Sequence, residues 1–272
     1  MSQVKEGAAP VQPLLELKAV SAGYNGQVVL SEVDLRIYPG DFIGVIGPNG
    51  GGKTTLLKVM LGLLTPRGGE VRYNFDAAGR PATRMGYLPQ FTLFDRQFPI
   101  TVLDVVLGGL VGKTGLMRSF SGKAHEEAMA SLQRMGIVAL KNRPVGELSG
   151  GQLQRTFLAR ALVADPGILL LDEPDTFVDA TFARSFYDLL QQINREVAIV
   201  LVSHDLGMIS SRVKSIACVN FKLHYHGSGE LTQEILDSYR CPIELVAHGP
   251  VPHRVLRQHD LWEEESPAEK GG

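Results

Sequence analysis

The fold of this chain is decided by nine consecutive residues, Gly47-Pro48-Asn49-Gly50-Gly51-Gly52-Lys53-Thr54-Thr55. They fit the P-loop pattern of a glycine, four residues, a second glycine, a lysine and a hydroxyl residue. Residues 42–46 before them have the composition of a short buried strand, and residues 54–61 have the apolar stripe of a helix. A strand, a loop and a helix in this order form the context in which the pattern binds phosphate groups.

The glycines of this loop allow successive backbone N–H groups to point toward one centre, and the helix that begins near Lys53 adds the positive end of its dipole. We therefore expect Lys53 to reach the β- and γ-phosphates of a nucleotide and the Thr54 hydroxyl to join the ligand shell of Mg²⁺. The alternative is a glycine-rich turn that binds nothing, and the complete pattern in its usual context argues against it.

The overall composition is that of an ordinary globular protein. Of the 272 residues, 44% are hydrophobic, and 27 Lys and Arg residues against 29 Asp and Glu residues give a formal net charge of -2. No dense basic run is present, so nucleic acid is not an expected partner. No stretch reaches the roughly 18 apolar residues of a membrane span, and the first residues lack the apolar core of a signal peptide, so we expect a cytosolic chain. Cys218 and Cys241 are expected to be reduced thiols.

The first part of the chain predicts an antiparallel sheet. Residues 1–13 have the composition of a flexible lead, and order is expected from residue 14 onward. Residues 14–17 and 28–37 show the apolar recurrence of strands, with Asn25-Gly26 as a turn between them. Tyr24 lies at this turn, where an aromatic ring can stack on an adenine base; the alternative is a tyrosine at the solvent edge.

After the P-loop helix, the sequence predicts a turn at residues 67–69 and a strand over residues 70–73. A further strand is expected over residues 85–90, ending at Gln90, because Pro89 cannot continue a ladder of backbone hydrogen bonds. Gln90 is thereby placed at the edge of the sheet where ligand-binding groups gather in open α/β folds.

Residues 91 to about 163 are expected to form a mainly helical insertion into the nucleotide-binding sheet. Thr101 is a plausible N-cap for an apolar helix over residues 102–110. After a break rich in glycine and serine, residues 124–135 have the pattern of a second, amphipathic helix.

The insertion closes with a second segment suited to anions, Leu148-Ser149-Gly150-Gly151-Gln152, which runs into a helical pattern. Ser149 is a natural N-cap, and the two glycines leave backbone N–H groups open. An ordinary capping turn is the alternative for this segment by itself. The presence of two such helix starts in one chain calls for a joint explanation.

Two apolar strands end in polar side chains. The run over residues 168–171 ends in Asp172-Glu173, and we expect it beside the P-loop strand, so that Asp172 shares the Mg²⁺ shell with Thr54 while Glu173 polarises a water molecule. The run over residues 197–202 leads to His204, which can contact the γ-phosphate or orient the attacking water. The alternatives are a solvated acidic turn and a polar strand cap.

Together these residues resemble the nucleotide-binding subunit of an ABC transporter over residues 14 to about 222. The matching positions are the Walker A residues 47–54, Gln90 of the Q-loop, the signature residues 148–152, the Walker B residues 168–172, the catalytic Glu173, Asp179 of the D-loop, His204 of the H-loop and Tyr24 of the A-loop. One departure is the bulky Phe177, which stands before Asp179 where relatives carry smaller residues.

The resemblance implies a fold, cofactors and roles. The fold is an α/β P-loop NTPase of ABC type, with a parallel core sheet, an antiparallel β subdomain and the helical insertion, and the cofactors are ATP and Mg²⁺. The implied catalytic residues are Glu173, His204, Gln90 and Lys53, and the implied Mg²⁺ ligands are Thr54, Gln90 and Asp172. The implied nucleotide contacts are Tyr24, Gly47, Pro48, Asn49, Gly50, Gly51, Gly52, Lys53, Thr54, Thr55, Ser149, Gly150, Gly151, Gln152 and Asp179.

The resemblance also implies partners. Two subunits face head to tail as a homodimer, so that ATP on one P-loop is covered by the signature helix of the other, which accounts for the two anion sites. The helical insertion, with Gln90, passes the motion to a membrane permease. The subunit is then peripheral to the cytoplasmic face of a bacterial membrane.

Residues 98–106 and 241–249, with Pro252-His253-Arg254, resemble the bacterial importers of zinc and manganese, which also use an extracytoplasmic metal-binding protein. Which of the two metals is carried stays open, and an iron-chelate importer or a soluble ABC ATPase of the iron–sulfur assembly type is the alternative. Five of the 7 histidines fall in the predicted C-terminal extension, residues 223–272, which ends in an acidic tail; they are His224, His226, His248, His253 and His259. Their irregular spacing favours structural or solvated side chains over a metal site with Cys241.

Overall fold

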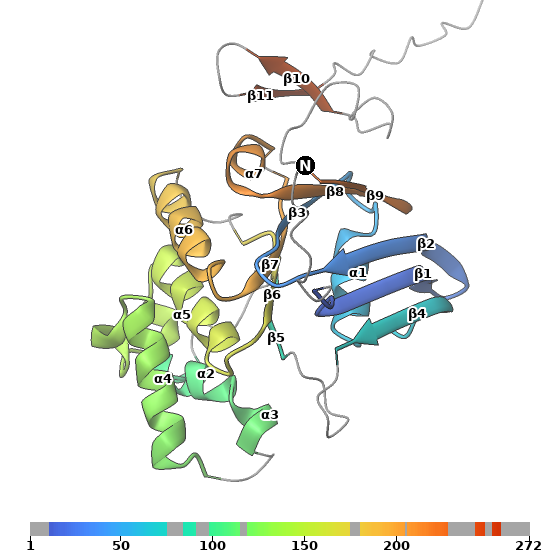
Figure 1. Cartoon of the computed structure of the whole chain (residues 1–272). Helices are drawn as coiled ribbons and strands as arrows, with labels where there is room; N and C mark the ends of the chain where they lie inside the picture. The colour runs from blue at the N-terminus through green and yellow to red at the C-terminus, as the bar shows by residue number, and fades with distance from the viewer. Residues whose placement is uncertain are drawn as a thin grey trace, which may run out of the picture.

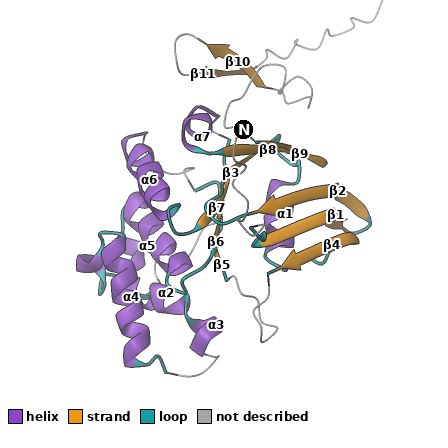
Figure 2. Ribbon diagram, viewed as in Figure 1, coloured by secondary structure: helices purple, strands orange, loops and turns teal. Residues whose placement is uncertain are grey.

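The computed structural model describes residues 11–74, 84–90, 98–114, 119–174, 180–204, 206–227, 243–247 and 252–256. Within these residues the strands form a six-stranded sheet of order β5-β6-β7-β3-β8-β9, a three-stranded sheet of order β2-β1-β4 and the hairpin β10-β11. Helices α2, α4, α5 and α6 cover one side of the six-stranded sheet, and α1 lies on the other side with the three-stranded sheet (Figures 1 and 2).

The six-stranded sheet is the centre of the molecule. Its strands are β5 (Met85–Leu88), β6 (Ile168–Asp172), β7 (Ala198–Val202), β3 (Phe42–Ile46), β8 (Ser215–Asn220) and β9 (Lys222–His226). Only β9 runs antiparallel to its neighbour among the pairs described. Every residue of β3, β6 and β7 is buried, because helices or a second sheet cover both faces, and this explains their unbroken apolar sequences.

The order of the strands corrects one expectation. The strand ending in Asp172 was expected beside the P-loop strand β3, but β7 lies between them and pairs with both. Three neighbouring strands with the same apolar character have no local feature that selects their partners, so the sequence pattern does not determine which two are adjacent. The consequence for the site is small, because parallel strands still deliver their carboxyl ends to one edge.

The antiparallel sheet contains β1 (Leu15–Tyr24), β2 (Gln27–Ile37) and β4 (Gly68–Tyr73). The predicted turn between β1 and β2 is confirmed: Asn25 and Gly26 have φ angles of 46° and 86°, the left-handed pair that a tight hairpin requires. The predicted turn at residues 67–69 is wrong in part, because Gly68 and Gly69 already belong to β4. Gly69 is required there, since a Cβ would lie 2.2 Å from the carbonyl oxygen of Ala19.

The helices are α1 (Lys53–Met60), α2 (Val102–Gly108), α3 (Val111–Thr114), α4 (Gly122–Arg134), α5 (Gly150–Leu162), α6 (Ala180–Ile193) and α7 (Leu206–Arg212), with short 3-10 turns at Val138–Leu140 and Val145–Glu147. Thr101 is the N-cap of α2, as predicted, and forms a capping box with Asp104. The helix ends two residues earlier than expected, and the next residue, Gly109, packs against α5 so closely that a Cβ would lie 2.3 Å from the carbonyl oxygen of Arg160.

The six-stranded sheet continues past residue 222, where the C-terminal extension was expected to begin, because β9 contains His224 and His226. The hairpin of β10 (Ile243–Ala247) and β11 (Pro252–Leu256) lies near α7 (Figure 1). Cys218 is buried, whereas Cys241, His248, His259 and the acidic tail lie outside the described residues. In the described parts of the chain, no helix has the length and apolar character to cross a membrane.

Candidate active site

The P-loop presents an uncapped helix start. Gly52 is the N-cap of α1 with a φ angle of 103°, and no side chain accepts a hydrogen bond from the first turn. Gly47 has a φ angle of 151°, and a Cβ there would lie 2.0 Å from the carbonyl oxygen of Val219, so only glycine fits between the loop and β8. The N–H groups at this end of α1 are therefore available to an anionic ligand.

Lys53 lies across the loop that it follows in sequence. Its side chain is buried, and its Nζ donates to the carbonyl oxygens of Gly47 and Pro48, both at 3.0 Å. An ammonium group held by two neutral carbonyls keeps its charge at the centre of the loop. Phosphate oxygens are stronger partners for this charge than carbonyl oxygens are.

Thr54 and Asp172 are in contact, although β7 lies between the P-loop strand β3 and the strand β6 that ends in Asp172. The Thr54 hydroxyl donates to Oδ1 of Asp172 at 3.5 Å, and Asp172 is almost fully buried at the end of β6. Burial raises the pKa of Asp172 above its ordinary value, because the carboxylate is removed from water. A hydroxyl and a desolvated carboxylate are hard oxygen donors, and this donor set fits Mg²⁺.

Tyr87 is a member of this group that the sequence reasoning missed. Burial, with the nearby Asp172 carboxylate, raises the pKa of Tyr87 to about 12. The phenol therefore stays protonated close to the Asp172 carboxylate at neutral pH. The strand register brings Tyr87 close to Asp172. Tyr87 pairs with Leu170 in the adjacent strand, two residues before Asp172, so the side chains of Tyr87 and Asp172 lie on the α1 side of the sheet.

Glu173, Gln90 and His204 form a second group next to Asp172. Gln90 Nε2 donates to Oε2 of Glu173 at 2.8 Å, and Nδ1 of His204 lies 3.8 Å from the same oxygen. Glu173 has a φ angle of 47°, a left-handed conformation that is uncommon for a residue with a side chain, and its N–H donates to the carbonyl oxygen of Val202 at 2.9 Å. Two predicted residues, Gln90 and His204, thus converge on one carboxylate oxygen of a third, and Gln90 contacts Glu173 rather than Asp172.

The signature residues cap their own helix. Ser149 Oγ accepts from the N–H of Gln152 at 3.3 Å, and Gln152 Oε1 accepts from the N–H of Ser149 at 3.1 Å, which together form a capping box at the start of α5. Buried leucines of α5 pack in the core on one side of the six-stranded sheet, whereas those of α1 pack in the core on the other side. The two helix starts therefore do not face one ligand within a single chain.

Tyr24 lies beside the P-loop helix. It ends β1, its ring is 40% exposed, and Nζ of Lys58 on α1 lies 5.7 Å from the ring centroid. This exposed face is open to stacking by a planar group. Asp179 and Phe177 lie outside the described residues.

Of the five C-terminal histidines, His248 and His259 lie outside the described residues, as does Cys241, so the expectation for this set stays a prediction. The described ranges contain no group of three or more His, Cys, Asp and Glu side chains arranged to hold a metal ion. His224 and His226 lie on β9, and burial lowers the pKa of His226, helped by the neighbouring His224.

Comparison with known proteins gives a consistent result. The family model described as ABC transporter matches residues 30–176. A metal transport system ATP-binding protein of Thermotoga maritima is 37% identical over 219 residues, which cover 80% of this chain and 85% of the relative. The zinc uptake system ATP-binding protein ZurA of Listeria monocytogenes is 36% identical over 231 residues, covering 83% of this chain and 90% of the relative.

Solved structures agree on the fold. An inward-facing metal-chelate type ABC transporter superposes with a TM-score of 0.78 at 24% identity, covering 90% of this chain and 97% of that chain. A dimeric post-hydrolysis state of an ATP-binding cassette, bound to ADP and Pi, superposes with a TM-score of 0.63 at 25% identity, covering 80% of this chain and all of that chain.

Proposed function

This chain belongs to the ABC transporter family, and on that premise we propose that it is the ATP-hydrolysing subunit of an importer for a divalent metal ion, zinc or manganese. One observation carries the ATPase part of the proposal: Lys53, Thr54, Asp172 and Glu173 follow one another around the carboxyl edge of the sheet, with Glu173 held by Gln90. The metal part is supported by relatives named for zinc uptake and metal transport.

ATP binding uses groups that already point to one place. Tyr24 stacks on the adenine, the loop of residues 47–55 surrounds the phosphates, and Lys53 exchanges two carbonyl partners for phosphate oxygens. Thr54 and Asp172, with Gln90, would hold Mg²⁺, which would supply neutralisation of the phosphate charge.

Hydrolysis requires a base beside the γ-phosphate. Glu173 takes a proton from the attacking water, because its carboxylate directly follows Asp172 in sequence and is close enough for its charge to raise the pKa of Asp172. Gln90 and His204 restrict the orientation of this carboxylate through Oε2. His204 is in addition a donor for the γ-phosphate.

The second ATP-binding surface comes from a second copy of the chain. Because α1 and α5 pack on opposite sides of the sheet, Ser149, Gly150, Gly151 and Gln152 serve the ATP of a partner subunit, with Asp179 at the dimer interface. A homodimer supplies two such composite sites. The dimeric arrangement of the related cassette bound to ADP and Pi supports this assembly.

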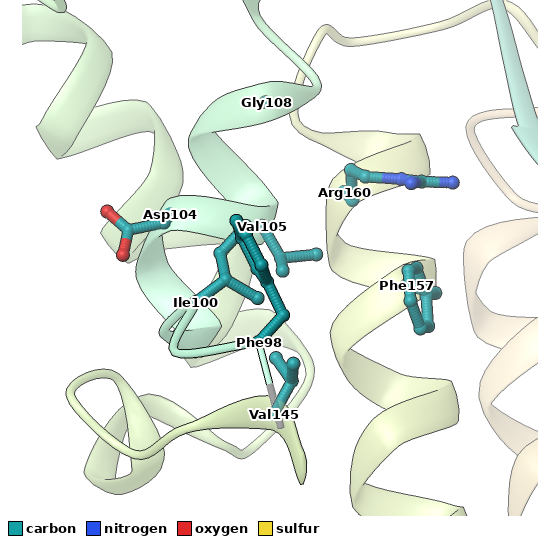
Figure 3. A pocket seen from close by; sticks show the side chains of 8 residues that line it. All are labelled: Phe98, Ile100, Asp104, Val105, Gly108, Val145, Phe157 and Arg160. Atoms are coloured by element: carbon teal, nitrogen blue, oxygen red, sulfur yellow. The ribbon is translucent and has the colours of Figure 1, made fainter. Parts of the chain in front are cut away.

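A surface pocket is suited to the permease. It has a volume of about 440 Å³ and lies between α2 and α5, with a mainly apolar lining (Figure 3). Phe98 lines this pocket and is 60% exposed. We assign the pocket to a short apolar segment of the membrane permease, on the cytoplasmic face of a bacterial membrane.

The docking proposal has a matched test. Phe98→Asp should abolish copurification with the permease while the isolated subunit hydrolyses ATP at the normal rate. Leu63→Asp is the control, since Leu63 is also a large exposed apolar residue, 69% exposed, outside the pocket. Equal permease recovery with both variants would contradict the assignment.

The function is tested in membrane vesicles that contain the chain with its copurifying permease, supplied with ATP and a metal-loaded extracytoplasmic binding protein. We expect ATP-dependent accumulation of zinc or manganese. Glu173→Gln should lower kcat by roughly 10²- to 10⁴-fold, the usual contribution of a general base, while ATP binding persists. ATPase activity with no permease and no uptake would move the chain to the soluble ABC ATPases, and uptake of an iron chelate alone would change the cargo.

A further inference from the structure

Glu173 is held from two sides by backbone contacts. On one side, its N–H donates to the carbonyl oxygen of Val202. On the other side, the carbonyl oxygen of the next residue, Pro174, accepts a hydrogen bond from Nε2 of Gln154, a side chain of α5. A left-handed, non-glycine residue persists only where its surroundings enforce it, and these two bonds bracket Glu173.

Gln154 has an environment that is unusual for its type. The residue is 2% exposed, although glutamine side chains mostly lie at the surface. Pro174 is buried as well, so the bond between them is shielded from water. The amide oxygen Oε1 of Gln154 has no hydrogen-bond partner among the residues that the structure describes, so the amide is retained there at a cost in free energy.

The same helix begins at the signature residues. Gln154 stands five residues after Ser149, a distance of about 7.5 Å along the axis at about 1.5 Å per residue. The capping box fixes the first turn, and Leu153 and Leu158 anchor the helix in the core. A displacement of the helix start is therefore carried to Gln154 as a rigid movement.

We propose that Gln154 is a positioning residue that sets the orientation of Glu173 through the Pro174 carbonyl and makes it depend on the contacts of the signature helix start. The proposal rests on the proposed function, in which that helix start contacts the ATP of the partner subunit. Occupancy of one ATP site is then reported to the catalytic glutamate of the other by a path inside one chain: Ser149, α5, Gln154, Pro174, Glu173. The two sites are thereby coupled.

The first test compares homodimers. Gln154→Met keeps the length of the side chain but removes the donor, so kcat should fall about 10- to 100-fold, as for a misplaced catalytic group, while KM for ATP changes less than about 3-fold. The Hill coefficient for ATP should fall toward one. Ser131→Ala is the control, because it also removes a buried hydrogen bond to α5. This bond runs from Ser131 Oγ to the carbonyl oxygen of Ala159 at 2.8 Å, and Ala159 lies five residues beyond Gln154 in the helix.

A second test uses heterodimers in which one chain carries Glu173→Gln, so that only one site hydrolyses. With Gln154→Met in the chain that retains Glu173, activity should fall at least about 10-fold. With Gln154→Met in the Glu173→Gln chain, activity should stay within about 3-fold of the heterodimer without it. Equal effects of the two placements would overturn the proposal, because a loss of stability does not depend on placement.

If Gln154→Met does not fold, Gln154→Leu replaces it in both tests, since its apolar side chain also removes the amide donor without burying a charge. A Glu173→Gln homodimer that hydrolyses at the normal rate would contradict the proposed function. A normal kcat and Hill coefficient in the Gln154 variant, with an inactive Glu173→Gln homodimer, would contradict this inference alone.

Discussion

The starts of α1 and α5 are both suited to anions, but they are built in opposite ways. At α1 the N-cap is Gly52 and no side chain occupies the first turn, whereas at α5 Ser149 and Gln152 satisfy each other's backbone N–H groups. The open end can bind phosphate in the isolated chain. The capped start of α5 is stable without a ligand, and this fits its proposed role at the ATP of a partner subunit.

The largest effect is expected from closing the open end. Gly47→Ala would place a Cβ 2.0 Å from the Val219 carbonyl oxygen, so the loop must move away from its phosphate-binding shape. We expect the affinity for ATP to fall by more than about 100-fold, measured by equilibrium binding, because a shift of the loop removes several N–H donors at once.

The matched variant is Gly50→Ala, where a Cβ would meet nothing within 4 Å but the φ angle is 77°. Only backbone strain of about 1–2 kcal/mol opposes it, so its loss of affinity should be about 10-fold. Equal losses in the two alanine variants would show that the contact with β8 does not control the loop.

An intermediate effect is expected at the capped end. Ser149→Ala and Thr101→Ala each remove a capping box, at α5 and α2, and each should cost about 1 kcal/mol of stability, or roughly 2–4 °C in Tm. Only Ser149→Ala should also lower ATPase activity, by about 10-fold. The two variants are compared by thermal unfolding and by steady-state hydrolysis, and a similar loss of hydrolysis in Thr101→Ala would make the role of Ser149 purely structural.

The smallest effect is expected on the Mg²⁺ requirement of the site beside α1. Tyr87→Phe removes the hydroxyl near Asp172, so the Mg²⁺ concentration for half-maximal hydrolysis should rise about 10-fold, the lower range for a lost supporting contact. Chelation of Mg²⁺ should stop hydrolysis altogether. The variant is compared with wild type in a Mg²⁺ titration at saturating ATP; an unchanged midpoint would contradict the supporting role.

Much of the site can be predicted from short segments of the sequence. Each predicted feature depends on residues that are close together along the chain: the P-loop, the caps at Ser149 and Thr101, and the Asn25-Gly26 turn. The placement of Glu173, Gln90 and His204 after strands also followed from the rule that parallel strands deliver their carboxyl ends to one edge.

Other features needed the assembled sheet. The expectation that β6 lies beside β3 was wrong, and Tyr87 and Gln154 went unnoticed. A tyrosine in a strand and a glutamine in a helix are common, and neither carries a signal until its partner is known. Their partners are Asp172 and Pro174, which belong to other elements.

By itself, the sequence determined the phosphate loop, the two helix starts, the buried strands and the membership of the ABC transporter family, since motifs and propensities act between near neighbours along the chain. The tertiary structure decided the order of the strands, the contact of Thr54 with Asp172 across 118 residues, and the bond from Gln154 that holds the backbone behind Glu173. These depend on which faces of the sheet the helices cover, and packing of all the elements together sets that choice.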